Sequence, residues 1–292
     1  MLQQLLVNGI IAGGIYALVA LGFSVIYRTV KFFHFAHGVV YTAGAYIAYT
    51  LAIQLGVPFV VAFVCAVLAA AVTGVLIDRT VYRPLRLKGA SNLIFLLASF
   101  GVFVFLQNLI QLVYGAQILS LRTGPVTEGY HVFSAVITPT QVTILAVSII
   151  LMVGLWVFIM KTKLGKAMRA VSDDPIAANV VGINPEKIIL LSFLIGSALA
   201  GAAGVLIALE TNIEPTMGFA AILKGIIAAI VGGIGSIPGA MFGGFFLGMA
   251  ENLGIAWIPS GWKDAIAFAI LIVFLLARPR GFLGIKGEME VA

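Results

Sequence analysis

Lys224 and Glu251 stand out because each carries a charge in a stretch that is otherwise apolar. A charged side chain at the centre of a bilayer costs about 2.5–3.5 kcal/mol on insertion scales, so each of them needs a reason. Two interpretations fit. The residues line a polar path through the molecule, or they form a structural ion pair in which the lysine can also reach the interface along its aliphatic stem.

His34 and His37 form an H-x-x-H pattern, which places both imidazoles on one face of a helix. A metal site would need further ligands, and no cysteine or carboxylate lies near them in the sequence. We therefore expect no metal site. The two histidines remain candidates for lining a path, with packing or hydrogen bonding as the alternative.

Catalytic and nucleotide-binding patterns are missing. The sequence shows no Ser-His-Asp arrangement, no acidic pair of defined geometry and no metal motif. The fragment Gly165-Lys166-Ala167 lacks the upstream glycine and the hydroxyl residue of a P-loop. We expect a chain that is not an enzyme and binds no cofactor.

The run GGIGSIPGAMFGG, residues 232–244, is too rich in glycine for a straight helix. Irregular backbone at membrane depth is tolerated where it is buried in protein or lines a cavity. The run therefore predicts a broken helix beside a path, and ordinary close packing of small residues is the alternative. The candidate path positions in it are Gly232, Gly233 and Gly235.

The polar segment 161–187 predicts a short helix held between two long ones. Asp174 followed by Pro175 is an N-cap with proline at the first helical position, and Gly182 suits the left-handed residue after the helix. A small capped helix flanked by charge is typical of a docking element, and a simple connecting turn is the alternative. The candidate docking residues are Asp173, Asp174, Pro175, Ala177, Ala178 and Gly182.

The composition places these residues in a membrane. Of 292 residues, 62% are hydrophobic and 10% are charged, whereas soluble domains run at about 45–50% and about 25%. A single cysteine, Cys65, excludes an internal disulfide and a cysteine-based metal site. We expect one transmembrane domain covering residues 1–292.

Hydropathy predicts nine spans, because each crossing needs about 20 apolar residues. The stretch 38–55 and the two stretches within 219–254 are short and rich in glycine, so either region could be broken or re-entrant. The predicted fold is an all-α, polytopic bundle of about eight to nine transmembrane helices with short broken or re-entrant segments. The spans are 5–27, 38–55, 58–77, 92–114, 140–160, 188–209, 219–234, 239–254 and 264–277.

The basic residues predict the orientation. Fourteen of the 17 Lys and Arg residues lie in segments 28–37, 78–90, 161–187 and the C-terminal tail, which share one side if nine spans alternate. The positive-inside rule makes that side cytoplasmic, with the N-terminus outside and the C-terminus inside. The net charge of +6 therefore reflects topology, and no nucleic-acid partner is expected.

Several motifs resemble a known family. Ala177-Ala178, three residues and Gly182 resemble the coupling loop of ABC importer permeases, although Ile176 stands where that pattern has a glutamate. Three longer stretches resemble the branched-chain amino acid permeases, closer to their LivH-type than their LivM-type subunits. One departure is His34, where an asparagine would be expected. The stretches cover residues 14–46, 161–184 with 191–204, and 213–244.

The resemblance implies a permease subunit of an ABC importer in a bacterial inner membrane. It implies a second, LivM-like permease subunit, two cytoplasmic ATPase subunits and an external solute-binding protein. ATP and Mg²⁺ would be used by the ATPases, and leucine, isoleucine or valine would be carried across the bilayer. The segment 161–187 would couple ATP hydrolysis to alternating access.

The residues alone leave other functions open. The solute could be urea, a short amide or another amino acid. A stand-alone secondary transporter or channel would need its own coupling or selectivity site, for which only Lys224 and Glu251 offer charge within the spans. A structural membrane subunit that lines no path is a third class.

Overall fold

The computed structural model describes residues 1–122, 129–132 and 134–284, and within them the chain is almost entirely helical. The first half contains α1 (Leu2–Val30), α2 (Ala36–Tyr49) with a π-helical end (Thr50–Gln54), α3 (Phe59–Ile77), a π-helical turn (Asp78–Tyr82), α4 (Arg83–Leu87) and α5 (Asn92–Tyr114). The second half contains β1 (Tyr130–Val132), β2 (Ala135–Ile137), α6 (Pro139–Lys161), α7 (Lys163–Asp173), α8 (Pro175–Val180), α9 (Pro185–Glu210), α10 (Met217–Gly232), α11 (Ile237–Gly254), a 3₁₀ turn (Ser260–Trp262) and α12 (Lys263–Ala277).

The predicted all-α membrane fold is confirmed, but the count of eight to nine spans is not. Six helices are long and apolar enough to cross a bilayer, or up to seven if the bent pair α10–α11 counts as one span. The axes of α10 and α11 differ by 117° across their break. The 16 residues of α10 cover only about 24 Å, whereas the hydrocarbon core is about 30 Å thick.

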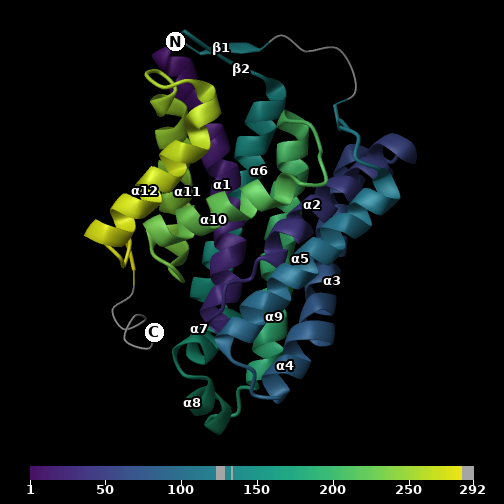
Figure 1. The fold of residues 1–292 in the computed structure, drawn as a ribbon, viewed down its shortest axis with the longest axis vertical. Coiled ribbons are helices and arrows are strands. Elements are labelled where there is room, and N and C mark those ends of the chain that lie inside the picture. Colours follow the sequence, from purple (N-terminus) through teal and green to yellow (C-terminus); the bar gives the residue numbers. More distant parts are fainter. Residues whose placement is uncertain (123–128, 133, 285–292) are drawn as a thin grey trace.

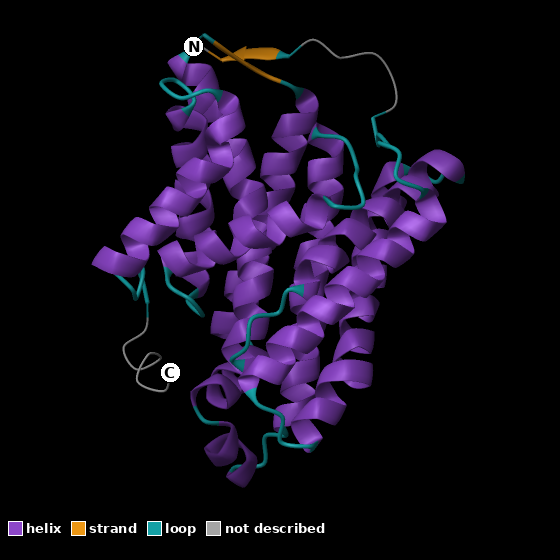
Figure 2. Ribbon diagram, viewed as in Figure 1, coloured by secondary structure: helices purple, strands orange, loops and turns teal. Residues whose placement is uncertain are grey.

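Helix α2 is the other departure. It has 14 residues and is not among the six candidate spans. The connection from α1 climbs into the bundle before α2 begins at mid-height (Figure 2). The segment 28–37, expected to lie at one surface, therefore contains residues of the core.

Helix α1 lies at the centre of the bundle. Its most apolar stretch is 83% buried, whereas that of α12 is 6% buried. It packs against α6, α9, α10 and α11, and its closest neighbour is α11. Helices α3, α5, α6 and α12 form the outside and expose apolar side chains, as expected for surfaces that face lipid or another subunit.

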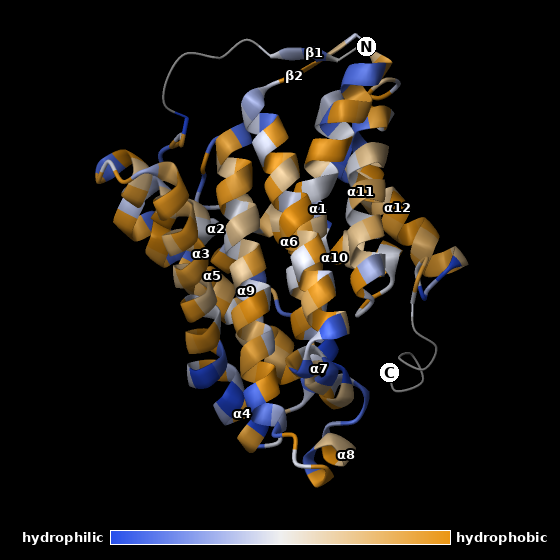
Figure 3. Cartoon of the chain, turned by 180° about the vertical axis from the view of Figure 1, so that it is seen from behind, coloured by the Kyte–Doolittle hydropathy of each residue, from blue (hydrophilic) through white to orange (hydrophobic). Residues whose placement is uncertain are grey.

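The two ends of the bundle differ. The N-terminus and the β1–β2 hairpin lie at one end, and α4, α7 and α8 lie at the other (Figure 1). Hydrophilic residues gather at α4 and α7, while the long helices between the ends are mostly hydrophobic (Figure 3). The hairpin pairs His131 with Val136, and Gln4 Oε1 on α1 accepts a hydrogen bond from the Val136 amide at 2.8 Å. Glu128 and Lys286, which the charge analysis also used, lie outside the described residues.

This separation allows the orientation to be tested with single cysteines in a Cys65→Ser background. Asn179→Cys places a thiol on α8 and Gln117→Cys places one at the opposite end, and both positions are exposed. We expect a membrane-impermeant maleimide to label Gln117→Cys on intact cells and Asn179→Cys only after lysis, because the α8 end carries most of the basic residues. If only Asn179→Cys were labelled on intact cells, the orientation would be the opposite of the one expected.

Candidate functional site

An unusually close approach of α1 and α11 positions the buried carboxylate of Glu251. A β-carbon added at Gly13 would lie 2.8 Å from the Phe245 Cα, and one added at Gly9 would lie 2.9 Å from the Met249 Cα. Gly244 and Gly248 of α11 face α1 in the same way. Because these positions lack side chains, the two backbones touch, and Tyr16 of α1 reaches Glu251 of α11.

Tyr16, Lys224 and Glu251 form one hydrogen-bonded cluster. The Lys224 Nζ lies 3.2 Å from Glu251 Oε2, and the same oxygen accepts a hydrogen bond from the Tyr16 hydroxyl at 2.8 Å. Lys224 also donates to the Tyr16 oxygen at 3.2 Å. Glu251 is fully buried, so its charge depends on these partners. The ion pair between Lys224 and Glu251, one of the two interpretations that the sequence allowed, is present in the structure. Tyr16 was missed because its position in an apolar run gave no signal.

Asp264 completes the cluster from α12. Its Oδ1 lies 3.1 Å from Lys224 Nζ, and its side chain is 68% exposed. The contact opens onto a hollow of about 190 Å³ between α10 and α12. The hollow is lined by Phe219, Ala220, Leu223, Lys224, Ile227, Asp264, Ala267 and Phe268. The sequence placed Asp264 at a membrane edge but gave no reason to pair it with Lys224.

The two histidines belong to a different, aromatic cluster. Both are fully buried, and His34 Nδ1 lies 2.9 Å from the Tyr82 hydroxyl. The His34 ring also packs edge-on against Phe32 and Phe193. Within the described ranges no group of three or more metal-ligating side chains occurs. The histidines thus lie in the core and not at the membrane boundary where the sequence placed them.

The predicted helix break is confirmed at Gly233 and Gly235, whose φ angles are 112° and 78°. Ser236 caps the new helix by accepting a hydrogen bond from the Gly239 amide. The chain after α12 closes the other side, because the Leu283 amide donates to the Gly232 carbonyl at 2.9 Å. The break is therefore buried in protein, as irregular backbone at membrane depth must be. Whether Gly232, Gly233 and Gly235 line a path remains a prediction.

The segment 161–187 contains the expected capped helix, α8. Asp174 Oδ1 accepts hydrogen bonds from the amides of Ile176 and Ala177 at 2.8 and 3.0 Å. At the other end Gly182 has φ = 87°, and the Ile183 amide returns to the Ala178 carbonyl at 2.9 Å. This pattern is a Schellman motif, so Gly182 holds the left-handed position that terminates the helix.

The exposed face of α8 differs in part from the predicted docking surface. Ala177 is exposed, but Ala178 is buried because that side of α8 packs against α7 and α9. The exposed apolar side chains are Ile176, Val180 and Val181, which are 75–83% accessible. We call these three residues together with Ala177 the α8 surface.

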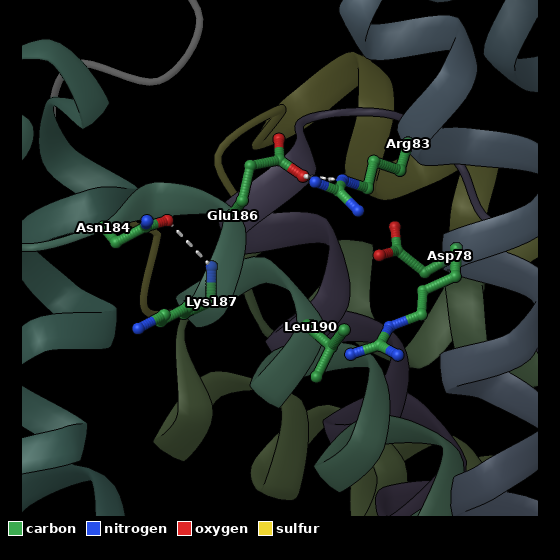
Figure 4. A pocket seen from close by; sticks show the side chains of 7 residues that line it. Asp78, Arg83, Asn184, Glu186, Lys187 and Leu190 are labelled. Carbon is green, nitrogen blue, oxygen red and sulfur yellow. Dashed lines mark hydrogen bonds and ion pairs between the residues drawn. The ribbon is translucent and has the colours of Figure 1, made fainter.

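Ionic contacts on two sides hold the α8 region to the bundle. Arg28, in the last turn of α1, donates to Ser172 Oγ at 2.8 Å and lies 3.6 Å from Asp173 Oδ1. On the other side Arg86 of α4 pairs with Glu186 at the start of α9 and with Asp78, at 2.9 and 2.7 Å. Glu186 also pairs with Arg83, 3.8 Å away, and both side chains line a hollow of about 250 Å³ (Figure 4). Displacement of α8 would therefore reach α1 through the end of α7, and α4 through the start of α9.

Along nearly its whole length the chain is similar to known proteins. Residues 5–275 match the family model described as branched-chain amino acid transport system / permease component. BraD of Pseudomonas aeruginosa, a high-affinity branched-chain amino acid transport system permease protein, is 41% identical over 99% of this chain and 97% of its own. LivH of Escherichia coli K12 is 40% identical with the same coverage, and a probable LivH of Methanocaldococcus jannaschii is 31% identical over 97% and 93%.

A solved structure supports the fold alone. PsaBC from Streptococcus pneumoniae in complex with Fab is 14% identical, with a TM-score of 0.51 over 95% of this chain and 92% of that chain.

The buried cluster predicts non-additive effects of mutation. Lys224→Met and Glu251→Gln should each lower thermal stability of the purified protein, since removal of one partner of a buried ion pair typically costs about 3–5 kcal/mol. The double variant should recover part of that loss, and a double-mutant cycle measures the coupling.

Lys263 provides the matched control for this cycle. It is the next lysine in the sequence, and it donates to Asn252 Oδ1 at 3.1 Å and not to Glu251. Lys263→Met combined with Glu251→Gln should give additive losses. Additive losses for Lys224 and Glu251 as well would show that the two residues act separately.

Proposed function

This chain belongs to the family of branched-chain amino acid transport system permease components, and from that premise we propose that it carries leucine, isoleucine or valine into the cell as one subunit of an ATP-driven importer. The observation that carries the proposal is similarity at about 40% identity along essentially the whole length of named permeases. Similarity over the full length of both chains matters here because a permease domain works as one bundle, without a separable binding module.

We propose that the chain works with a second, LivM-like permease subunit, two cytoplasmic ATPase subunits and an external solute-binding protein. ATP and Mg²⁺ would bind to the ATPases. The exposed apolar faces of α3, α5, α6 and α12 supply surfaces that a second membrane subunit or lipid would cover. The assembly would sit in the inner membrane with the α8 end in the cytoplasm.

The α8 surface is the proposed docking site for an ATPase. Its three large apolar side chains stand in a polar region, and burial of such side chains against a partner is worth about 1.5–3 kcal/mol each. The helix is capped at both ends, and the contacts of Arg28 with α7 and of Glu186 with α4 hold the segments on either side of it. A push on α8 would thus be passed to α1 and α9, which run through the centre of the bundle.

Four of the path candidates, those on α10, on α11 and at the break between them, fit this mechanism. Lys224 and Glu251 lie on α10 and α11, on either side of the buried break at Gly233 and Gly235. A break allows the two half-helices to change their mutual angle without stretching hydrogen bonds. We propose that nucleotide-driven movement of α8 changes the α10–α11 angle and thereby exposes the charged cluster to one side or the other.

Gly182→Val tests coupling in the complete importer reconstituted in vesicles. Valine tolerates φ = 87° poorly, at a cost of about 1–3 kcal/mol, so α8 should end differently and misplace its exposed surface. Leucine uptake should fall at least about tenfold, and leucine-loaded binding protein should no longer stimulate ATP hydrolysis. Insertion into the membrane should be normal, because a β-carbon added at Gly182 has nothing within 4 Å of it.

Gly56→Val is the control, since Gly56 also has a positive φ (66°) with open space around it, but it lies in the turn before α3. This variant should keep wild-type coupling. Wild-type uptake by Gly182→Val would reject the coupling role of α8. Stimulation of the wild-type importer by urea and not by leucine would overturn the proposed solute.

A further inference from the structure

The hollow between α10 and α12 combines two opposite charges with an apolar wall. Lys224 and Asp264 face one another at its rim, 3.1 Å apart, and the rest of the lining is aliphatic or aromatic. The lining includes no other charged side chain. At about 190 Å³ it is smaller than the pockets of about 300–1,000 Å³ that hold drug-sized ligands, so it suits a small solute.

The two carboxylates on Lys224 differ in how firmly they are held. Glu251 is fully buried and also bonded by Tyr16, so its contact with the lysine is fixed. Asp264 is 68% exposed and lies in the first turn of α12. Exposed ion pairs contribute only about 0–1 kcal/mol, so a solute can separate Lys224 from Asp264 at little cost.

We propose that this hollow binds the zwitterionic head of an α-amino acid, which extends the proposed function by naming the site and the chemical class of its ligand. The solute carboxylate takes the place of the Asp264 carboxylate on Lys224 Nζ, and the solute ammonium pairs with Asp264. Each charge of the solute then meets an opposite charge, and Glu251 keeps the lysine charged and in place.

The apolar wall accounts for an aliphatic side chain. Phe219, Leu223, Ile227 and Phe268 present hydrocarbon next to the charged rim. Burial of a leucine or valine side chain there is favourable by about 25 cal/mol per Å² of apolar area. Urea and short amides carry neither charge and little hydrocarbon, so they would use none of these features.

The same residues indicate where this face lies in the assembly. Ionisable groups within membrane segments face a bundle interior or a water-filled cavity, because exposure to lipid is costly. The hollow that Lys224 and Asp264 line is open to the outside of the bundle between α10 and α12. We therefore infer that this face borders an aqueous space and not the lipid. A site on it can receive a solute from outside, since α12 starts at the end of the bundle that carries the N-terminus (Figure 1).

The site can be tested by solute protection of a cysteine in the complete importer. Ala220→Cys in a Cys65→Ser background places a thiol in the hollow, and a charged thiosulfonate reagent reports whether water and solute reach it. Leucine should slow the reaction, and 4-methylpentanoate, which lacks the ammonium group, should need a higher concentration. Adding Asp264→Asn should raise the leucine concentration for half-protection about tenfold, because the ammonium group loses its partner. The same change should lower the concentration needed for 4-methylpentanoate, because its carboxylate no longer has to displace that of Asp264 from Lys224.

Gln117→Cys, exposed at the same end but outside the hollow, should react at a rate that leucine does not change. Glu214→Gln, which removes an exposed charge from the same end, should leave protection of Ala220→Cys unchanged.

Reaction of Ala220→Cys that leucine does not slow, while the importer still takes up leucine, would overturn the site and leave the proposed function standing. Equal protection in Asp264→Asn and in its parent would also overturn it. Absence of leucine uptake would contradict the proposed function itself.

Discussion

Close contact between the backbones of α1 and α11 is the constraint on which the rest of the structure depends. Glycines stand on both sides of this contact, at Gly9 and Gly13 on α1 and at Gly244 and Gly248 on α11. In lipid, helices gain little from hydrophobic burial against one another, so packing at short range must supply the stability. The same contact brings the Tyr16 hydroxyl to Glu251 and makes a fully buried carboxylate tolerable.

Helix α1 also connects the two functional regions. Tyr16 belongs to the charged cluster, and Arg28, three turns later, holds Ser172 and Asp173 just before α8. On the other flank Glu186 joins the start of α9 to Arg86 and, through it, to Asp78. Rigid helices joined by charge-assisted hydrogen bonds can pass a displacement over their whole length, which loops without such contacts could not do.

Local signals in the sequence predicted local structure well. Asp174 and Gly182 were identified as the caps of α8 because capping depends on residues within one turn. Lys224 and Glu251 were paired because charges in apolar segments need partners. Tyr16 and Asp264 were missed because they join the cluster from distant helices, and Ala178 was taken as exposed because nothing local marks the side of α8 that packs inward. The span count was not confirmed at α2 and α10, because hydropathy does not show where in the bundle a helix begins.

The central claim is that the charged cluster faces the route of the solute while α8 faces the ATPase. An electron cryo-microscopy structure of the assembled importer in lipid nanodiscs would test this claim most directly. We expect the α10–α12 face with Lys224 and Asp264 to border a lipid-free space beside the second permease subunit. We expect Ile176, Val180 and Val181 to be covered by an ATPase subunit in the same structure. Ordered lipid packed against Lys224 and Asp264, or an α8 surface left in solvent in the complete assembly, would contradict the account.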